Sequence, residues 1–167
     1  QDQAGLPDPE ISGLLHVIIP EGVTAIAPQA FESCTNIASI TIPDSVTSIG
    51  MKAFYRCVGL TSATIPDGVN AIGNYAFCTC SGLTSINIPE GITIICDFAF
   101  YGCSGLTSLT LPGTVTTILR YAFYGCSGLT SMAIPNSVTT IGDSAFNRCS
   151  GLTSVTIPDG VTTIGNY

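Results

Sequence analysis

Eight cysteines are the side chains with the most chemistry available to them, because a thiolate is both a nucleophile and a metal ligand. Six form a column in which each follows a phenylalanine or its equivalent by three residues, on one side of a turn. A residue that recurs once per structural layer beside a ring is typical of a buried thiol acting as a small hydrophobe. Stacked layers would hold neighbouring Cβ atoms ~5 Å apart, beyond the ~3.5–4.5 Å that a disulfide requires. The predicted ladder of free thiols comprises Cys34, Cys57, Cys80, Cys103, Cys126 and Cys149.

Cys78 and Cys96 stand outside this column. Cys78 takes the position that Tyr55 holds one repeat earlier, so we expect it to face outward, whereas Cys96 replaces the glycine seen at Gly73. A metal site built from Cys78, Cys80 and Cys96 is the alternative interpretation. It requires Cys80 to turn away from the core, and it lacks a fourth ligand. We therefore predict no metal centre.

One histidine and a column of acids are the remaining candidates for chemistry. His16 is the only histidine, and no cysteine of the core column should reach it, so a Cys–His nucleophile is not expected. Acids follow most of the prolines directly, and stacked layers would hold them ~5 Å apart, which is compatible with weak calcium binding. The competing interpretation is turn chemistry in Pro-Asp-Gly and Pro-Glu-Gly, with acids that keep the loops soluble. These acids are Glu21, Asp44, Asp67, Glu90 and Asp159.

The elements that must position these residues follow from an internal repeat of 23 residues. Its proline recurs without an insertion or deletion, followed three residues later by valine or isoleucine and six residues later by isoleucine. An Ala-Phe pair, the cysteine, and then leucine or isoleucine complete each unit. Chance does not maintain such a register. The prolines are Pro20, Pro43, Pro66, Pro89, Pro112, Pro135 and Pro158.

Each repeat can be read as one coil of a solenoid. In residues 106–111 the apolar side chains alternate with small hydroxyls as in a strand, and Pro-Asp-Gly at 66–68 is a turn. A second extended segment such as 138–142 follows, and the Ala-Phe-x-x-Cys segment predicts a single helical turn. One coil cannot bury its apolar side alone, but stacked coils can. We predict a solenoid with a parallel β-sheet on the concave face, and with short second strands and single helical turns on the other sides.

At these columns the sequence resembles a known family, the BspA-like or treponemal-type bacterial leucine-rich repeats. The unit L-x-x-I-x-I-P-x-x-V-x-x-I-G-x-x-A-F-x-x-C-x-G is repeated over about residues 14–167. The resemblance implies a curved leucine-rich-repeat solenoid, usually part of a secreted or surface-attached protein that acts as an adhesin. It offers no catalytic residue to carry over, because the repeat motif is structural.

The two ends of the sequence depart from the repeat. Residues 1–13 are predicted to be an N-terminal lead-in or cap, and residues 14–167 the solenoid, with about six complete repeats and partial ends. The sequence stops at Tyr167, where the next Ala-Phe pair would begin. Either the natural protein continues, or another subunit covers this end.

Composition excludes several classes of function. A formal charge of −7, with only four Lys and Arg residues, disfavours nucleic acid and anionic membrane surfaces as partners. Apolar residues make up 46% of the chain, but no run approaches the ~18 that a membrane-spanning helix requires. We therefore expect neither nucleic-acid binding nor membrane insertion.

Two outward surfaces remain as candidate binding sites. The first is the exposed face of the predicted sheet, where small hydroxyls either keep the sheet soluble or form a polar platform for a protein or glycan. The second is a flank where aromatic residues occupy two columns three residues apart, and where rings are expected to be half exposed. The face comprises Ser62, Thr64, Ser85, Asn87, Ser108, Thr110 and Ser131, and the flank comprises Tyr55, Tyr75, Phe98, Tyr101, Tyr121 and Tyr124.

These observations predict a binding scaffold without enzyme activity or cofactor. The first hypothesis is an extracellular or cell-surface adhesion module for a protein or glycan on another cell or matrix. The alternative is a structural protein that forms homo-oligomers through the aromatic flank or the open C-terminal end. An enzyme would need a pocket with converging polar groups, which regular small side chains do not make.

Overall fold

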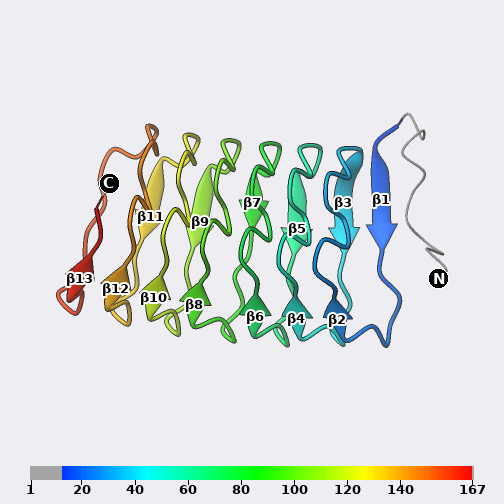
Figure 1. Ribbon diagram of the computed structural model, residues 1–167, viewed down its shortest axis with the longest axis horizontal. Coiled ribbons are helices and arrows are strands. Elements are labelled where there is room, and N and C mark those ends of the chain that lie inside the picture. The colour runs from blue at the N-terminus through cyan, green and yellow to red at the C-terminus, as the bar shows by residue number, and fades with distance from the viewer. Residues whose placement is uncertain (1–12, 167) are drawn as a thin grey trace.

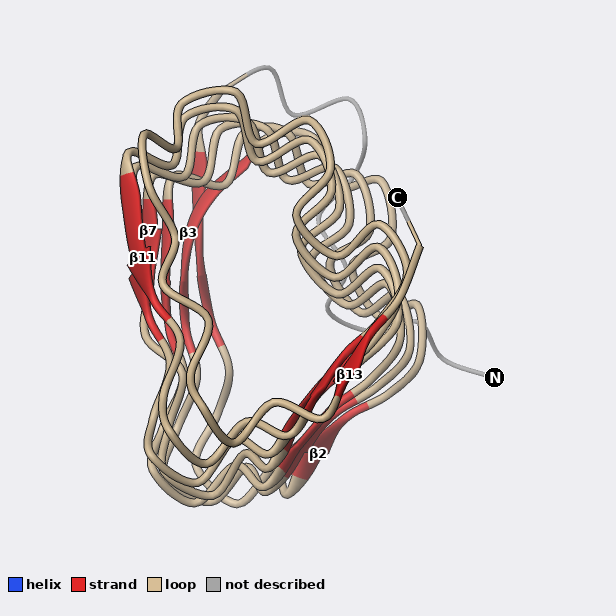
Figure 2. Ribbon diagram, turned by 90° about the vertical axis from the view of Figure 1, so that its left-hand side faces the viewer, coloured by secondary structure: helices blue, strands red, loops and turns tan. Residues whose placement is uncertain are grey.

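The computed structural model describes residues 13–166, which form a solenoid of about seven coils stacked along one axis (Figure 1). We name each coil by the proline that opens it, so the Pro43 coil runs from that residue to the next repeat. Viewed along the stack, each coil passes through two strand layers and a third side made of turns (Figure 2). The predicted lead-in lies almost wholly outside the described residues.

The longer strands pair in parallel on one side, as the sequence predicts. Equivalent residues of successive repeats face each other, for example Ser39 with Ser62 and Ser108 with Ser131. From β5 to β11 the inward residues are buried and the outward ones, mostly serine and threonine, are exposed, which makes a polar surface that we call the serine–threonine face. Its strands are β1 (Leu15–Ile18), β3 (Ile37–Thr41), β5 (Ser62–Thr64), β7 (Ser85–Ile86), β9 (Ser108–Thr110) and β11 (Ser131–Ala133).

Short second strands line the next side of each coil, again as predicted. Each follows its proline turn and buries the second residue of the pair, except at the C-terminal end. They are β2 (Ala25–Ile26), β4 (Ser48–Ile49), β6 (Ala71–Ile72), β8 (Ile94–Ile95), β10 (Thr117–Ile118), β12 (Thr140–Ile141) and β13 (Thr163–Ile164).

The prediction of single helical turns on the third side is wrong, since the described residues contain no helix. Two positions in each repeat adopt the left-handed region, such as Lys52 (φ 57) and Arg56 (φ 61), and this interrupts any helical run. Alternate N–H groups then donate to the next coil, as Phe54 does to the carbonyl of Ala76 at 2.8 Å. The N–H groups between them close four-residue turns within the coil, as the Tyr55 N–H does by donating to the Lys52 carbonyl at 3.0 Å.

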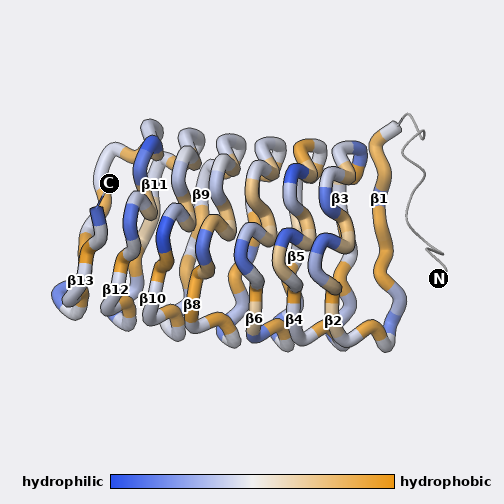
Figure 3. Tube along the Cα trace, in the orientation of Figure 1, coloured by the Kyte–Doolittle hydropathy of each residue, from blue (hydrophilic) through white to orange (hydrophobic). Residues whose placement is uncertain are grey.

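Phenylalanine rings and thiols fill the core beneath these turns. The rings stack from coil to coil with centroids 5.1 to 5.6 Å apart. All eight cysteines are free, and five of the column donate S–H bonds of 3.0 to 3.1 Å to a phenylalanine carbonyl of the preceding coil. The predicted ladder of free thiols is therefore confirmed. Hydrophobic segments recur at the same height in every coil (Figure 3).

Both sheets are interrupted at one joint, between the Pro66 coil and the Pro89 coil. The first-face sheets are β1-β3-β5-β7 and β9-β11, and the second-side sheets are β2-β4-β6 and β8-β10-β12-β13. Just before the break on the first face, one backbone hydrogen bond still joins the two coils, from the Thr107 N–H to the Thr84 carbonyl at 3.3 Å. The turns cross the same joint intact, with Tyr75, Phe77 and Thr79 all donating to the next coil.

A change of side chain accompanies the break on the second side. A Cβ added at Gly73 would lie 2.6 Å from the backbone nitrogen of Met51, so this column fits glycine closely against the preceding coil. Cys96 brings a Cβ into the column directly above Gly73. Leu119, one coil further, keeps its bond to the Ile95 carbonyl at 2.9 Å. We infer that the second-side sheet is interrupted here because a coil with a side chain in this column follows a coil with glycine.

Candidate interaction surfaces

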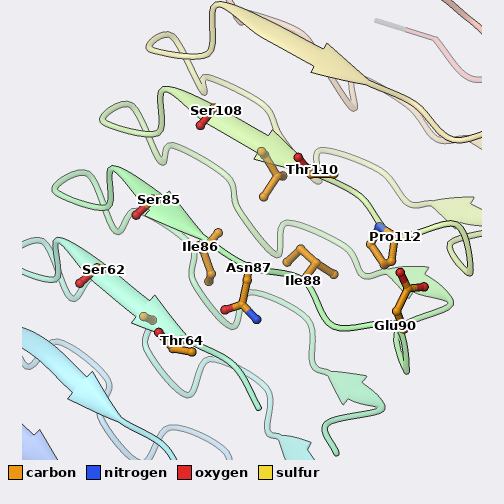
Figure 4. Close-up of a pocket in the computed structure, with 12 residues that line it drawn as sticks. Ser62, Thr64, Ser85, Ile86, Asn87, Ile88, Glu90, Ser108, Thr110 and Pro112 are labelled. Atoms are coloured by element: carbon orange, nitrogen blue, oxygen red, sulfur yellow. The ribbon is translucent and has the colours of Figure 1, made fainter. Parts of the chain in front are cut away.

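The serine–threonine face presents hydroxyls that the fold does not use. Within residues 13–166, the predicted members of this face other than Asn87 form no side-chain hydrogen bond to the protein. A hollow of about 510 Å³ lies among them, from Ser62 across to Ser108, with Glu90 and Pro112 toward one end (Figure 4). Serine and threonine hydroxyls both donate and accept, so this face can bind hydroxyl- or amide-bearing partners.

Asn87 differs from the other predicted members of the face because its amide is engaged. Its Nδ2 donates to the carbonyl of Ile65 at 2.7 Å, and its Oδ1 accepts from the Ile65 N–H at 2.8 Å. The side chain thereby replaces main-chain pairing at the end of β5. At the N-terminal edge, His16 is exposed and contacts Ser39 and Thr41 at 2.5 and 3.2 Å.

Five of the six residues of the aromatic flank form two stacks of rings on the turns, and Tyr55 stands outside both. Tyr75, Phe98 and Tyr121 stack with centroids 4.6 and 4.7 Å apart, and Tyr101 stacks on Tyr124 at 4.8 Å. All the predicted flank residues are half exposed, as expected. Because the ring faces cover one another, their edges and hydroxyls form the outer surface. Face-on packing of a sugar against these rings is thus restricted to the ends of the stacks.

A cation lies over an aromatic ring at each end of the flank. Lys52 Nζ lies 5.4 Å from the ring centroid of Tyr55 and 6.0 Å from that of Tyr75. At the other end, Arg148 Cζ lies 5.6 Å from the ring centroid of Tyr124. These distances are within the range of cation–π attraction. Sequence reasoning missed this arrangement, although all four cations stand eight to thirteen residues after a proline.

The acids that follow the prolines form a separate strip, the acidic edge, made of Glu21, Asp44, Asp67, Glu90 and Asp159. All of them are exposed. Within residues 13–166, no three acidic, histidine or cysteine side chains converge as a metal site. The same residues contain no helix that could span a membrane.

The expected outward position of Cys78 is wrong, because only 4% of this side chain is exposed. Tyr55 and Tyr101 stand in the same column one coil to either side. Because their side chains are larger, we infer that they reduce the solvent exposure of the shorter Cys78 thiol. Burial raises the pKa of the Cys78 thiol to about 11 and that of Cys57 to about 12. Burial raises the pKa of the half-buried Cys96 as well. At neutral pH these thiols are protonated and poor nucleophiles.

Comparison with known proteins identifies the repeat. The profile of the BspA type leucine rich repeat region matches residues 11–126 and 71–167 in six copies. The chain belongs to this family. No protein of curated function matches the sequence.

Solved structures of bacterial leucine-rich repeat proteins superpose on the solenoid. A leucine-rich repeat protein of T. pallidum is 31% identical with a TM-score of 0.85, covering 92% of this chain and 73% of its own. One from Bacteroides ovatus is 35% identical with a TM-score of 0.82, covering 88% of this chain and 38% of its own. A leucine-rich cell surface protein of Faecalibacterium prausnitzii is 27% identical with a TM-score of 0.57, covering 84% and 59%.

The chain therefore spans most of the treponemal relative but less than half of the Bacteroides one. The comparisons establish the family and the parallel solenoid, an architecture typical of protein-interaction scaffolds. The activity of a longer parent protein is a separate question, because fold alone does not determine function.

Proposed function

We propose that the chain is an adhesion module on the cell surface or outside the cell, which binds a protein or glycan of another cell or matrix. The observation that supports this most directly is the serine–threonine face, a surface whose hydroxyls are exposed and unused by the fold. The similarity to a leucine-rich cell surface protein of Faecalibacterium prausnitzii agrees with a surface location.

We place the binding site for this ligand along the hollow between β5 and β9. Ser62 and Ser85 face each other across adjacent strands, and Ser108 continues the row. Many weak hydrogen bonds along a preformed surface give specificity for an extended partner without ordering cost in the scaffold. No enzymatic step is included, because no titratable groups converge in the hollow apart from the single carboxylate of Glu90.

Bead adhesion tests this proposal. Beads coated with the chain are counted on cultured epithelial cells and on a purified matrix, for the wild type and two variants. Ser85→Lys/Ser108→Lys places bulky cations in the hollow, and Tyr101→Ser/Tyr124→Ser alters the flank as a matched control. We expect the first variant to lose at least about tenfold in adhesion, more than 1.4 kcal/mol, and the control to retain it.

Pretreatment of the cells assigns the ligand class: protease sensitivity indicates a protein, and glycosidase sensitivity a glycan. Absence of wild-type adhesion to both surfaces would overturn the adhesion proposal. Loss in the flank variant alone would move the binding site from the serine–threonine face to the flank.

A further inference from the structure

Charge is divided between two sides of the coils. The four cations of the chain all lie on the aromatic flank, and the acidic edge carries no cation. The proline turns lie at the bottom of the view along the stack, and the turns of the flank at the upper right (Figure 2). The two strips are therefore separate surfaces of one scaffold, and only the flank carries cations.

The acids on the flank are engaged within the flank. The Arg120 guanidinium lies 3.3 Å from the Asp97 carboxylate, and Asp143 accepts a hydrogen bond of 2.6 Å from the Asn166 N–H. Glu32 accepts a hydrogen bond of 2.6 Å from the side-chain amide of Gln29. Three cations have no carboxylate partner among the described residues, namely Lys52, Arg56 and Arg148.

The spacing of these free cations matches that of two acids on the opposite strip. Lys52 belongs to the Pro43 coil and Arg148 to the Pro135 coil, four repeats later. Asp67 and Asp159 follow Pro66 and Pro158 and are separated by the same four repeats. With coils ~4.8 Å apart, each pair is separated by about 19 Å along the stack. The two acids share one column, whereas Lys52 and Arg148 stand nine and thirteen residues after their prolines.

The segment between the charges also matches. The coils between the cations carry the stacked rings of Tyr75, Phe98 and Tyr121. On the edge, two of the three positions between the matched acids are uncharged, because Gly113 and Asn136 interrupt the column. A one-coil shift therefore sets cations against acids at both ends, and most of the rings against an uncharged turn surface.

We propose that copies of this chain associate side by side, with the flank of one on the acidic edge of the next and a shift of one coil. The contact joins two different surfaces, so it leaves a free flank and a free edge at the ends of each row and does not close as a dimer. Lys52 and Arg148 pair with Asp67 and Asp159 of the neighbouring copy, and the ring edges cover its proline turns.

Charge reversal tests this arrangement by sedimentation velocity over a range of concentrations, at about 20 mM and about 500 mM salt. The flank variant is Lys52→Glu/Arg148→Glu, and the edge variant is Asp67→Lys/Asp159→Lys. We expect wild-type mass to rise with concentration at low salt only, and each variant alone to stay monomeric. A mixture of the two variants restores complementarity at every contact and recovers association.

The control is Glu21→Lys/Asp44→Lys, which changes the edge charge equally but outside the matched coils, and it retains association. Unchanged circular dichroism confirms that each variant is folded. A monomeric wild type at low salt, or a variant mixture that stays monomeric, would overturn the proposal. Bead adhesion through the serine–threonine face is a separate readout, so failure of one proposal leaves the other standing.

Discussion

The aromatic flank and the two sheets behave differently at the joint between the Pro66 and Pro89 coils. Both sheets are interrupted there. The turns of the flank, in contrast, cross the joint with three backbone hydrogen bonds, and the core beneath them crosses it with the Phe77–Phe100 stack and the hydrogen bond of the Cys103 thiol. The turns and the rings beneath them therefore provide the continuous support of this solenoid. The strands are the part that tolerates a departure from the repeat.

The largest loss of stability is expected from a substitution in the core beneath the turns of the flank. Phe100→Ala removes a fully buried ring that stacks on Phe77 at 5.6 Å and Phe123 at 5.5 Å. We expect the free energy of unfolding to fall by about 4 kcal/mol, measured by urea denaturation. Tyr101→Ala, one residue along and half exposed, should cost about 1 kcal/mol. Equal losses in the two variants would contradict the view that the buried rings dominate.

The second test extends the sheet defect. Gly73→Ala adds a Cβ within 2.6 Å of the Met51 nitrogen, and we expect a loss of about 2 kcal/mol and faster hydrogen exchange at the amide of residue 73. Gly113→Ala is the control, since an added Cβ meets nothing within 4 Å and stability should change by less than about 0.5 kcal/mol. If both variants had the same stability, close packing of the glycine column would be the wrong explanation.

The third test uses pH to weaken the thiol ladder. Burial raises the pKa of Cys57 to about 12, so the unfolded chain loses this proton first as pH rises. The contribution is fully present below about pH 8.5 and is lost above it by about 1.4 kcal/mol per pH unit. Urea denaturation at a series of alkaline pH values measures the slope. Cys57→Ala should reduce that slope by this amount, and an unchanged slope would assign the loss to other groups.

The smallest effect is the repair of the joint. Cys96→Gly restores the glycine column above Gly73, and the amide of residue 96 should then pair with Ile72. The expected gain in stability is below about 1 kcal/mol, because glycine also increases the freedom of the unfolded chain. Hydrogen exchange is the sharper measurement, and slower exchange at residues 93 and 96 is predicted. Unchanged exchange would place the cause of the break elsewhere, with Asn87 as the next candidate.

The sequence predicts the parts of the fold that the 23-residue period encodes directly. The parallel sheet, the second strands, the free thiol ladder and the half-exposed tyrosines are confirmed. The helical turns are wrong because two positions in each repeat adopt positive φ. The column of Lys52 and Tyr75 contains no glycine to indicate this, and the column of Arg56 contains glycine only at Gly102 and Gly125. Cys78 is misplaced because column position alone does not account for the size of neighbouring side chains.

The candidate surfaces were predictable by column but not by chemistry. Asn87 belongs to the predicted polar face, yet its amide is engaged by Ile65, a contact that depends on where β5 ends. The pairing of Asp97 with Arg120, which leaves other cations free, likewise depends on the distance between coils. The use of either surface for binding stays a prediction.

The equal spacing of cations and acids has a consequence for how such genes can change length. Duplication of one repeat between the Pro66 and Pro135 coils would lengthen both separations by one coil and preserve their match. Duplication between the Pro43 and Pro66 coils would lengthen only the cation spacing, and duplication between the Pro135 and Pro158 coils only the acid spacing. A copy lengthened between the Pro66 and Pro135 coils would still match copies of itself but not the parent, so duplication there would generate variants that assemble separately from the parent. Duplication at either of the other two positions would remove the match within the variant itself.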